Sequence, residues 1–238
     1  MGTRLGRVGF EVGWARGVAG FWAELLGWVV VVERGGVVEV VAPDAEGFEV
    51  GLWFGEGVGV KVGKNRIHLD LASRSVEHQR GLVDRALGLG ARRVDIGQGE
   101  VPWEVMADPE GNEFCVLEPR EQYVDTGAVA AIVVDARDPG RSARFWSAVS
   151  GWPVMHDSGE FSGIRSATGQ GPWVEFLRSA GGERGRVRLD VLCSGAEDVD
   201  RLCAAGAKPL GHSAFGDAAM ALADPDAYEF GLLRARSD

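Results

Sequence analysis

Charged and aromatic side chains share one face of several strand-like segments, and two groups of them have the chemistry of a binding or catalytic site. The first group consists of Arg7, Arg188 and Trp53. Two guanidinium groups beside an indole would hold a carboxylate, a phosphate or an enolate. The alternative is that acids of the chain neutralise both arginines. The candidates for this internal pairing are Glu11, Asp190, Glu49 and Glu229.

The second group contains side chains suited to proton transfer. We expect it to comprise His68, Asp70, Glu113, Cys115 and Glu175, together with Trp173. His68 would be the general base, oriented by a carboxylate, and Glu113 is the carboxylate that we pair with it. Cys115 would act as a nucleophile only if its pKa were lowered. For His68, the alternatives are a hydrogen-bonded histidine with a structural role and a relic of a lost metal site.

Three tryptophans belong to the same pattern. Trp53 and Trp173 have the parity of the charged residues, which favours a partly enclosed cleft over a solvated sheet face. Trp103 follows Pro102 on a predicted strand near the mouth of the second group. Its ring would stack on a ligand there, and packing in the core is an equal alternative.

Alternating strands and four helices must position these side chains. Each strand places apolar residues on one face and charged residues on the other. The apolar faces are Val8, Phe10 and Val12; Ile67, Leu69 and Leu71; Phe114 and Val116; Val187, Leu189 and Val191; Phe230 and Leu232. The helices are predicted from Val18 to Leu26, from a Ser75 cap to Gly90, from Pro139 after an Asp138 cap, and from a capping box of Ser194 and Glu197 to Gly206. Helices should cover the apolar faces, which leaves the charged faces to line clefts.

The chain repeats itself, with four blocks recurring in the same order about 120 residues later. The first copies are GFWAELLGW at 20–28, RIHLDLA at 66–72, LGARRV at 89–94 and ADPEGNEFCVL at 107–117. The second copies are RFWSAVSGW at 144–152, RVRLDVL at 186–192, AGAKPL at 205–210 and ADPDAYEFGLL at 223–233. We therefore expect two homologous domains, about 1–120 and 126–236, joined by the polar stretch EPREQYVDTG.

The composition restricts the class of protein. The 238 residues are 45% hydrophobic and 25% charged, which is typical of a globular protein. The net charge of −10 repels phosphate backbones, so nucleic acid is excluded as a partner. No apolar run reaches the roughly 18 residues of a membrane span, and the N-terminus lacks the apolar core of a signal peptide. Three cysteines without a CxxC pattern favour the cytoplasm.

The repeated blocks resemble the glyoxalase-like branch of the vicinal-oxygen-chelate superfamily, the glyoxalase/bleomycin-resistance/dioxygenase type. The resemblance rests on FWAELLGW, HLDL, GARRV, VPW and DPEGNEFCVL, and it weakens in the second half, where RLDV and DPDAY replace HLDL and DPEGN. It implies an α+β fold of two tandem domains, each with two βαβββ modules, whose mixed sheets curl around clefts with helices outside. It also implies that the first module of one domain shares a cleft with the second module of the other, so that one chain acts as an internal pseudo-dimer.

Metal-using members of this family place His, Gln or Glu on the first and last strand of each module. The matching positions are Arg7, Gly55, Arg188 and Gly231 in one cleft, and His68, Cys115, Ala131 and Leu177 in the other. Arginine would repel a cation, and glycine, alanine and leucine side chains offer no donor. We therefore expect no metal and no other cofactor, with Glu113 and Glu175 as the remaining candidate donors in the second cleft.

Two hypotheses for the function follow from the resemblance. The first is a metal-independent protein that binds an aromatic or anionic metabolite or antibiotic in an inter-module cleft, as in bleomycin resistance; the eight tryptophans favour it. The second is a metal-independent lyase, isomerase or cyclase of bacterial secondary metabolism. In that enzyme His68 and Glu113 supply acid–base catalysis, and Arg7 with Arg188 forms an oxyanion clamp.

Two further interpretations remain, a metal-dependent dioxygenase or glyoxalase and a degenerate paralogue that serves as an interaction module. In every enzymatic or binding interpretation the expected partner is a small molecule. The chain would be a monomer or a homodimer, and neither membranes nor nucleic acids are expected partners.

Overall fold

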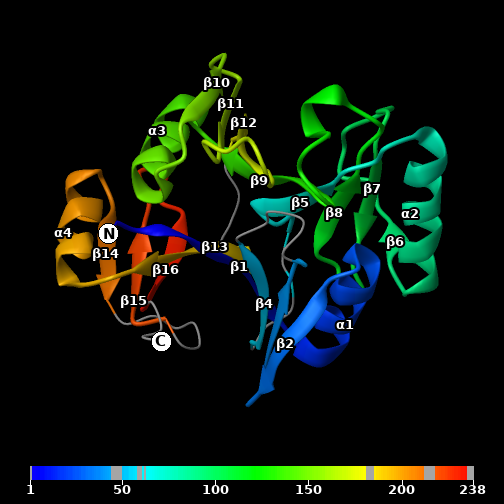
Figure 1. The fold of residues 1–238 in the computed structure, drawn as a ribbon, viewed down its shortest axis with the longest axis horizontal. Coiled ribbons are helices and arrows are strands. Elements are labelled where there is room, and N and C mark those ends of the chain that lie inside the picture. Colours follow the sequence, from blue (N-terminus) through cyan, green and yellow to red (C-terminus); the bar gives the residue numbers. More distant parts are fainter. Residues whose placement is uncertain are drawn as a thin grey trace.

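The computed structural model describes residues 2–43, 50–57, 61, 63–180, 185–211 and 218–234. They form two mixed β-sheets of eight strands each, with helices packed on one face of each sheet (Figure 1). We call the opposite face of each sheet its inner face. The α+β fold of two tandem repeats agrees with the sequence prediction. None of the described helices has the length and apolar character needed to cross a bilayer.

Each half of the chain contains two modules of similar order. The first half begins with β1 (Arg4–Val12), α1 (Ala15–Leu26), β2 (Val29–Arg34), β3 (Val37–Val41) and β4 (Gly51–Glu56). Its second module contains β5 (Ile67–Leu71), α2 (Val76–Gly88), β6 (Arg92–Arg93), β7 (Glu104–Ala107) and β8 (Glu113–Val116). After η2 (Glu121–Tyr123) come β9 (Val129–Ala136), α3 (Pro139–Ser150), β10 (Val154–Asp157), β11 (Phe161–Arg165) and β12 (Trp173–Arg178). The last module contains β13 (Val187–Cys193), α4 (Ala196–Ala204), β14 (Lys208–Gly211), β15 (Met220–Ala223) and β16 (Glu229–Arg234).

The sheets exchange modules between the two halves. The first sheet has the strand order β14-β15-β16-β13-β1-β4-β3-β2, and the second has the order β10-β11-β12-β9-β5-β8-β7-β6. Each sheet thus joins the first module of one half to the second module of the other. The two junctions are antiparallel, with Val8 opposite Leu189 in the first sheet and His68 opposite Val133 in the second. The internal pseudo-dimer implied by the resemblance is therefore present in the topology.

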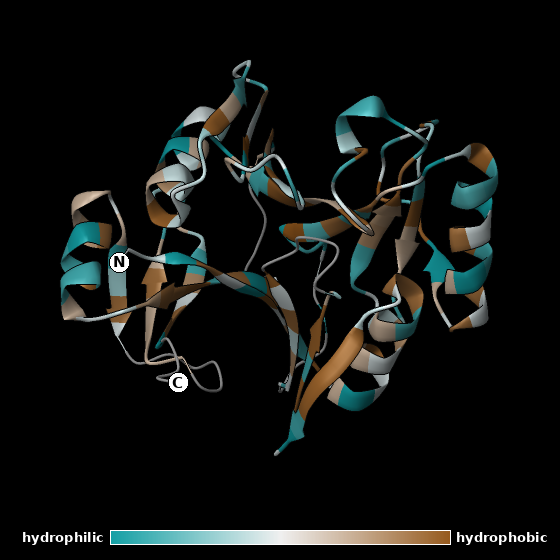
Figure 2. Ribbon diagram, in the orientation of Figure 1, coloured by the Kyte–Doolittle hydropathy of each residue, from teal (hydrophilic) through white to brown (hydrophobic). Residues whose placement is uncertain are grey.

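Strand parity separates the core from the inner faces as predicted. Val8 and Phe10 are buried against the helix side, and Ile67 and Leu69 are buried in the same way in the second sheet. Figure 2 shows apolar stretches of the helices turned toward the sheets and hydrophilic stretches turned outward. The strand β2 is an exception, because it lies at a sheet edge and its Val29 is 53% exposed.

The repeated FW and DP blocks meet in the core of each half. The indole of Trp22 donates a hydrogen bond of 3.2 Å to Asp108, and that of Trp146 donates one of 3.1 Å to Asp224. Burial raises the pKa of both carboxyls, and hydrogen bonds from the indoles and neighbouring groups oppose that rise. Each pair fastens a helix to the turn that precedes the last strand of a module.

Two helices begin at the predicted caps. The side chain of Ser75 accepts a hydrogen bond from the backbone of His78 at the start of α2. Asp138 accepts one from the backbone of Arg141 at the start of α3, with a proline following the cap. Both side chains satisfy amides that have no partner inside the helix.

The predicted capping box of Ser194 and Glu197 is wrong. The N-cap residue of α4 is Gly195, one position later. The carboxylate of Asp198 accepts a hydrogen bond of 2.7 Å from the amide of Ser194 and so closes the turn from inside the helix. The buried carboxylate of Asp198 therefore makes the capping contact that the sequence pattern assigned to Glu197.

Candidate functional site

The inner face of the first sheet holds Arg7 and Arg188 with Asp190 between them. The Nε atom of each arginine lies 2.9 Å from a different carboxylate oxygen of Asp190. Arg188 also lies 3.4 Å from Glu11. Both arginines and Asp190 are buried, and their mutual attraction offsets much of the cost of removing the charges from water. These contacts are the internal pairing that the sequence left as an alternative. Glu49, another candidate partner, lies outside the described residues.

Trp53 packs on this ion group, as its parity predicts. The guanidinium carbon of Arg7 lies 4.3 Å from the Trp53 ring centroid, and that of Arg188 lies 5.2 Å from it. Both distances are within the range of cation–π attraction. The indole itself is buried. The structure therefore brings Arg7, Arg188 and Trp53 together, with Asp190 bound to the Nε donor of each arginine.

The first inner face does not fit a metal ion. Gly55 and Gly231 stand at two of the positions expected for metal ligands. A Cβ atom on Gly55 would overlap the Trp53 indole, and one on Gly231 would lie 2.7 Å from Asp190. The amide of Gly231 also donates to Asp190 at 2.9 Å. Side chains of the protein thus occupy the space in which ligating side chains would meet, and the nearby permanent cations would repel a metal.

The inner face of the second sheet carries a buried titratable cluster of His68, Asp70 and Cys115. His68 and Asp70 lie two residues apart on β5, and Cys115 lies opposite Asp70 on the parallel strand β8. His68 Nε2 lies 3.3 Å from Asp70 Oδ1. The contact lacks hydrogen-bond geometry, and both Asp70 Oδ1 and His68 Nδ1 have no hydrogen-bond partner among the described residues. Two buried polar atoms of this face therefore have unused bonding capacity.

Glu175 joins the cluster from the other half of the chain. It pairs with Val133 on β9, which pairs with His68 on β5. The phenol of Tyr123 donates a hydrogen bond of 2.9 Å to Glu175. Burial raises the pKa of Glu175 to about 7; the Tyr123 hydrogen bond opposes the rise, and the negative charge of Asp70 adds to it. Glu175 therefore exchanges its proton near neutral pH, which is a property of acid–base groups in functional sites.

The linker between the halves covers this inner face. Tyr123, at the end of η2, packs with three buried residues, which are Cys115, Leu117 and Ala130. Trp103 and Trp173 flank this small cluster and are only partly buried. Trp173 Nε1 also donates a hydrogen bond of 3.4 Å to the carbonyl of Gln122. The sequence predicts a polar linker for this segment and does not identify Tyr123. The available signal is that Tyr123 is the one aromatic residue in this stretch of ten.

Glu113 is bound away from His68. Its Oε1 atom lies 2.5 Å from the Lys61 ammonium, and its Oε2 atom accepts a hydrogen bond of 3.2 Å from the Asn65 amide. The carboxylate in contact with His68 is that of Asp70. The structure thus places Glu113 on β8, as predicted, but gives it structural partners.

The second inner face carries three side chains that could ligate a metal ion. The donor atoms of His68, Asp70 and Cys115 lie within 4.8 Å of one another. However, burial and the charge of Asp70 raise the pKa of the Cys115 thiol, which holds the proton that a coordinating thiolate must lose. The opposing positions Ala131 and Leu177 carry no donor side chain. The residues present therefore do not reproduce a ligand set shared between two modules.

Comparison with known proteins supports the fold and the repeat. The family model described as "Glyoxalase-like domain" matches residues 7–117 and again 131–233. No curated protein matches the chain. Glyoxalase I from Zea mays superposes with a TM-score of 0.67 at 15% identity, over 98% of this chain and 92% of that one. A putative dioxygenase from Bacillus subtilis subsp. subtilis str. 168 gives a TM-score of 0.60 at 15% identity, over 98% and 86% of the two chains. At these identities the likeness shows the fold alone.

Proposed function

This chain belongs to the glyoxalase-like domain family, and from that premise we propose that it is a metal-independent small-molecule-binding protein of the glyoxalase/bleomycin-resistance type. The domain limits proposed with it are 1–120 and 126–236. The ligand lies on the inner face of the second sheet, between Trp103 and Trp173, with Tyr123 of the linker as a third wall. The chain works as a monomer, since its two halves already supply both modules of each sheet.

The observation that carries the proposal is the unused hydrogen-bonding capacity of His68 Nδ1 and Asp70 Oδ1. A buried polar atom without a partner costs about 1–3 kcal/mol, which a ligand that supplies the partner would recover. In the first sheet Arg7 and Arg188 already share the Asp190 carboxylate, which compensates part of their charge. The second inner face is therefore the better place for a ligand.

The same groups indicate the class of ligand. Asp70 and the partly ionised Glu175 would repel an anion, so the ligand is neutral or cationic near its polar end. Trp103 and Trp173 favour a flat aromatic body, because indole rings stack well on such surfaces. We propose an aromatic metabolite or antibiotic with a hydroxyl, amide or amine group that bonds to Asp70.

The experiment is a titration of the purified chain, followed by tryptophan fluorescence, with doxorubicin, which has a flat ring system and an amine, and with bleomycin, which carries a flat bithiazole and a cationic tail. Binding to Trp173→Ala and Asp70→Asn should weaken at least tenfold, while Trp14→Ala serves as the control because Trp14 is exposed and lies on another surface. The bound compound should be recovered unchanged, and elemental analysis should find no stoichiometric metal. Equal binding by all variants, or one tightly bound metal per chain, would contradict the proposal.

A second candidate is a metal-independent lyase, isomerase or cyclase. It is favoured by Glu175, whose pKa of about 7 lies beside the His68–Asp70 pair. His68 and Glu175 would then transfer protons; the Arg7–Arg188 clamp lies on the other sheet and would not contact the same substrate. Turnover that is lost in His68→Ala and unaffected by a chelator would favour this enzyme over the binding protein.

A further inference from the structure

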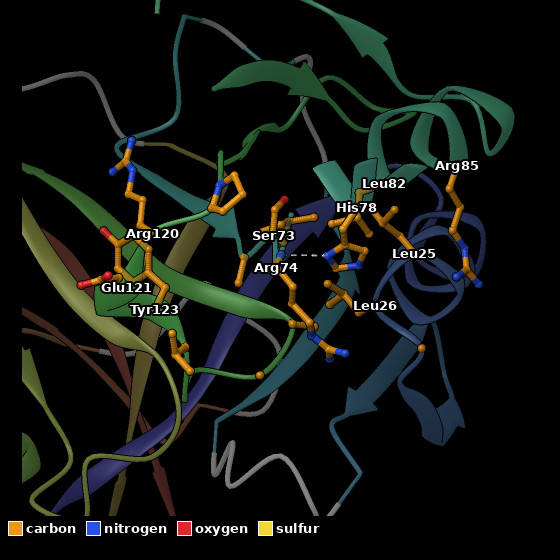
Figure 3. Close-up of a pocket in the computed structure, with 17 residues that line it drawn as sticks. Leu25, Leu26, Ser73, Arg74, His78, Leu82, Arg85, Arg120, Glu121 and Tyr123 are labelled. Carbon is orange, nitrogen blue, oxygen red and sulfur yellow. Dashed lines mark hydrogen bonds between the residues drawn. The ribbon is translucent and has the colours of Figure 1, made fainter. Parts of the chain in front are cut away.

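A further pocket lies between the end of α1, the start of α2 and the linker, and Tyr123 of the linker is part of its lining (Figure 3). Its volume is about 620 Å³. This is within the range of roughly 300–1,000 Å³ that drug-sized ligands occupy. Residues at the end of β5, from Leu71 to Arg74, form another wall. The pocket is therefore large enough for an organic molecule.

The pocket has an apolar interior and a basic margin. Its apolar wall is formed by Leu25, Leu26, Leu71 and Leu82. Its charged residues are Arg74, Arg85, Arg120 and Glu121, and His78 also lines it. Three arginines line this pocket, against Glu121 in its lining and Glu118, which pairs with Arg120, so the excess charge is positive although the chain as a whole carries a net charge of −10. The local potential thus favours an anion.

Two of these arginines have unoccupied guanidinium groups. Arg120 is bound to Glu118 at 2.6 Å. Among the described residues, by contrast, no carboxylate forms an ion pair with Arg74 or Arg85. Both side chains are labelled in Figure 3, which shows them on the β5 and α2 sides of the pocket. Their forked donors suit the oxygens of a carboxylate, sulfonate or phosphate.

A buried hydroxyl provides an independent indication of a ligand. Ser73 lines the pocket and is only 9% exposed, and its Oγ atom has no hydrogen-bond partner in the described part of the chain. Nearby, His78 accepts a hydrogen bond from the Arg74 amide through Nδ1, so that its proton is on Nε2. A polar ligand group would bond to the Ser73 hydroxyl where protein groups do not.

We propose that this pocket is a second binding site, distinct from the inner-face site, for an amphipathic anion. The ligand has one carboxylate, sulfonate or phosphate group, which Arg74 and Arg85 bind, and an apolar body, which contacts the leucine wall. The proposed inner-face site, with Asp70 and Glu175, favours a neutral or cationic ligand instead. The two sites therefore bind different ligand classes.

The test uses 8-anilinonaphthalene-1-sulfonate, an apolar anion whose fluorescence rises when water is excluded from it. We expect saturable binding of one molecule per chain. The double variant Arg74→Gln/Arg85→Gln should weaken that binding by about tenfold or more, as expected for the loss of charge-assisted hydrogen bonds. The matched control is Arg141→Gln, because Arg141 is an exposed arginine at the start of α3. Its binding should equal that of the parent chain.

Three additional measurements make the result decisive. Leu82→Trp should fill the pocket and displace the probe, while the uncharged probe N-phenyl-1-naphthylamine should bind equally well to the parent and the double arginine variant. Trp173→Ala should leave sulfonate binding intact, which separates this site from the inner-face site. Sulfonate binding that survives both Leu82→Trp and the arginine changes, or that has many equivalent sites, would overturn the proposal.

Discussion

The phenol of Tyr123 lies 2.9 Å from Glu175, so a residue of the linker controls the protonation of a carboxyl that belongs to the second half of the chain. Because the phenol donates to the ionised carboxylate, it favours the charged form and lowers the pKa of Glu175. Burial acts in the opposite direction and is the larger effect, which leaves the pKa at about 7. The linker is thus part of the electrostatics of the inner face.

The first prediction concerns Tyr123→Phe. Loss of the phenol should raise the pKa of Glu175 further above its present value of about 7, because burial then acts without that hydrogen bond. The measurement is a carbon-13 NMR titration of the Glu175 carboxyl. Tyr228→Phe is the matched control, because its phenol donates to the Val187 carbonyl in the other sheet. A Glu175 pKa that is unchanged or lower in Tyr123→Phe would refute this role of the linker.

The second prediction concerns the pH dependence of stability. The folded-state pKa of Glu175 is raised from 4.5 to about 7, so the folded chain holds a proton that the unfolded chain releases in this window. Its contribution to the free energy of unfolding is therefore fully present below pH 4.5 and falls as the pH rises to about 7. Each pKa unit corresponds to about 1.4 kcal/mol, which sets the total change on the order of 3 kcal/mol.

Glu175→Gln removes this titration. Relative to the parent, the variant should gain stability between pH 4.5 and 7, as measured by urea unfolding at several pH values. The raised pKa values of Asp108 and Asp224 act in both proteins and cancel from the difference. The exposed Glu24→Gln serves as a control. A stability difference between parent and Glu175→Gln that does not vary with pH would contradict the prediction.

The third prediction uses the internal repeat to compare two aspartates. Asp190→Asn leaves Arg7 and Arg188 buried without their shared carboxylate, and the loss of one partner of a buried ion pair costs about 3–5 kcal/mol. Asp70 occupies the matching position in the second sheet, where it lies beside the imidazole of His68 and the thiol of Cys115 and forms no ion pair with an arginine or lysine of the described residues. Asp70→Asn should therefore cost about 1 kcal/mol or less. Equal losses in the two variants, measured by chemical denaturation, would mean that the arginines do not depend on Asp190.

The fourth prediction concerns the FW and DP blocks. Trp22→Phe removes the donor to buried Asp108 and should destabilise the chain by about 1–3 kcal/mol, and Trp146→Phe should have a similar effect through Asp224. Thermal unfolding followed by circular dichroism provides the measurement. Trp14→Phe is the control, because Trp14 is 63% exposed. A loss confined to one of the two core variants would show that the repeats are not energetically equivalent.

Much of the fold follows from local sequence rules. The alternation around Arg7 and His68 sets which side chains face inward, because strand parity depends on neighbours in sequence. Ser75 and Asp138 were recognisable as caps for the same reason. Gly195 was not, since Asp198 closes the start of α4 with its own buried carboxylate, and burial depends on the tertiary structure.

The partners of the site residues were harder to predict. His68 contacts Asp70 and Glu113 contacts Lys61, whereas the sequence-based prediction pairs the histidine with Glu113. The choice depends on side-chain directions that period-2 patterns do not determine. The contacts of Tyr123 were not predicted, because a linker residue can pack on any nearby surface. No periodic pattern in the sequence indicates which surface it contacts.

The exchange of modules between the sheets frees the two clefts to diverge. In a dimer of identical chains, every substitution appears in both clefts, so one cannot lose its polar groups while the other keeps them. With both repeats in one chain, the RLDV and HLDL copies mutate separately. The first inner face now holds the ion group of Arg7, Arg188 and Asp190. The second inner face holds the protonatable groups His68 and Glu175 at the pseudo-symmetric place in the other sheet.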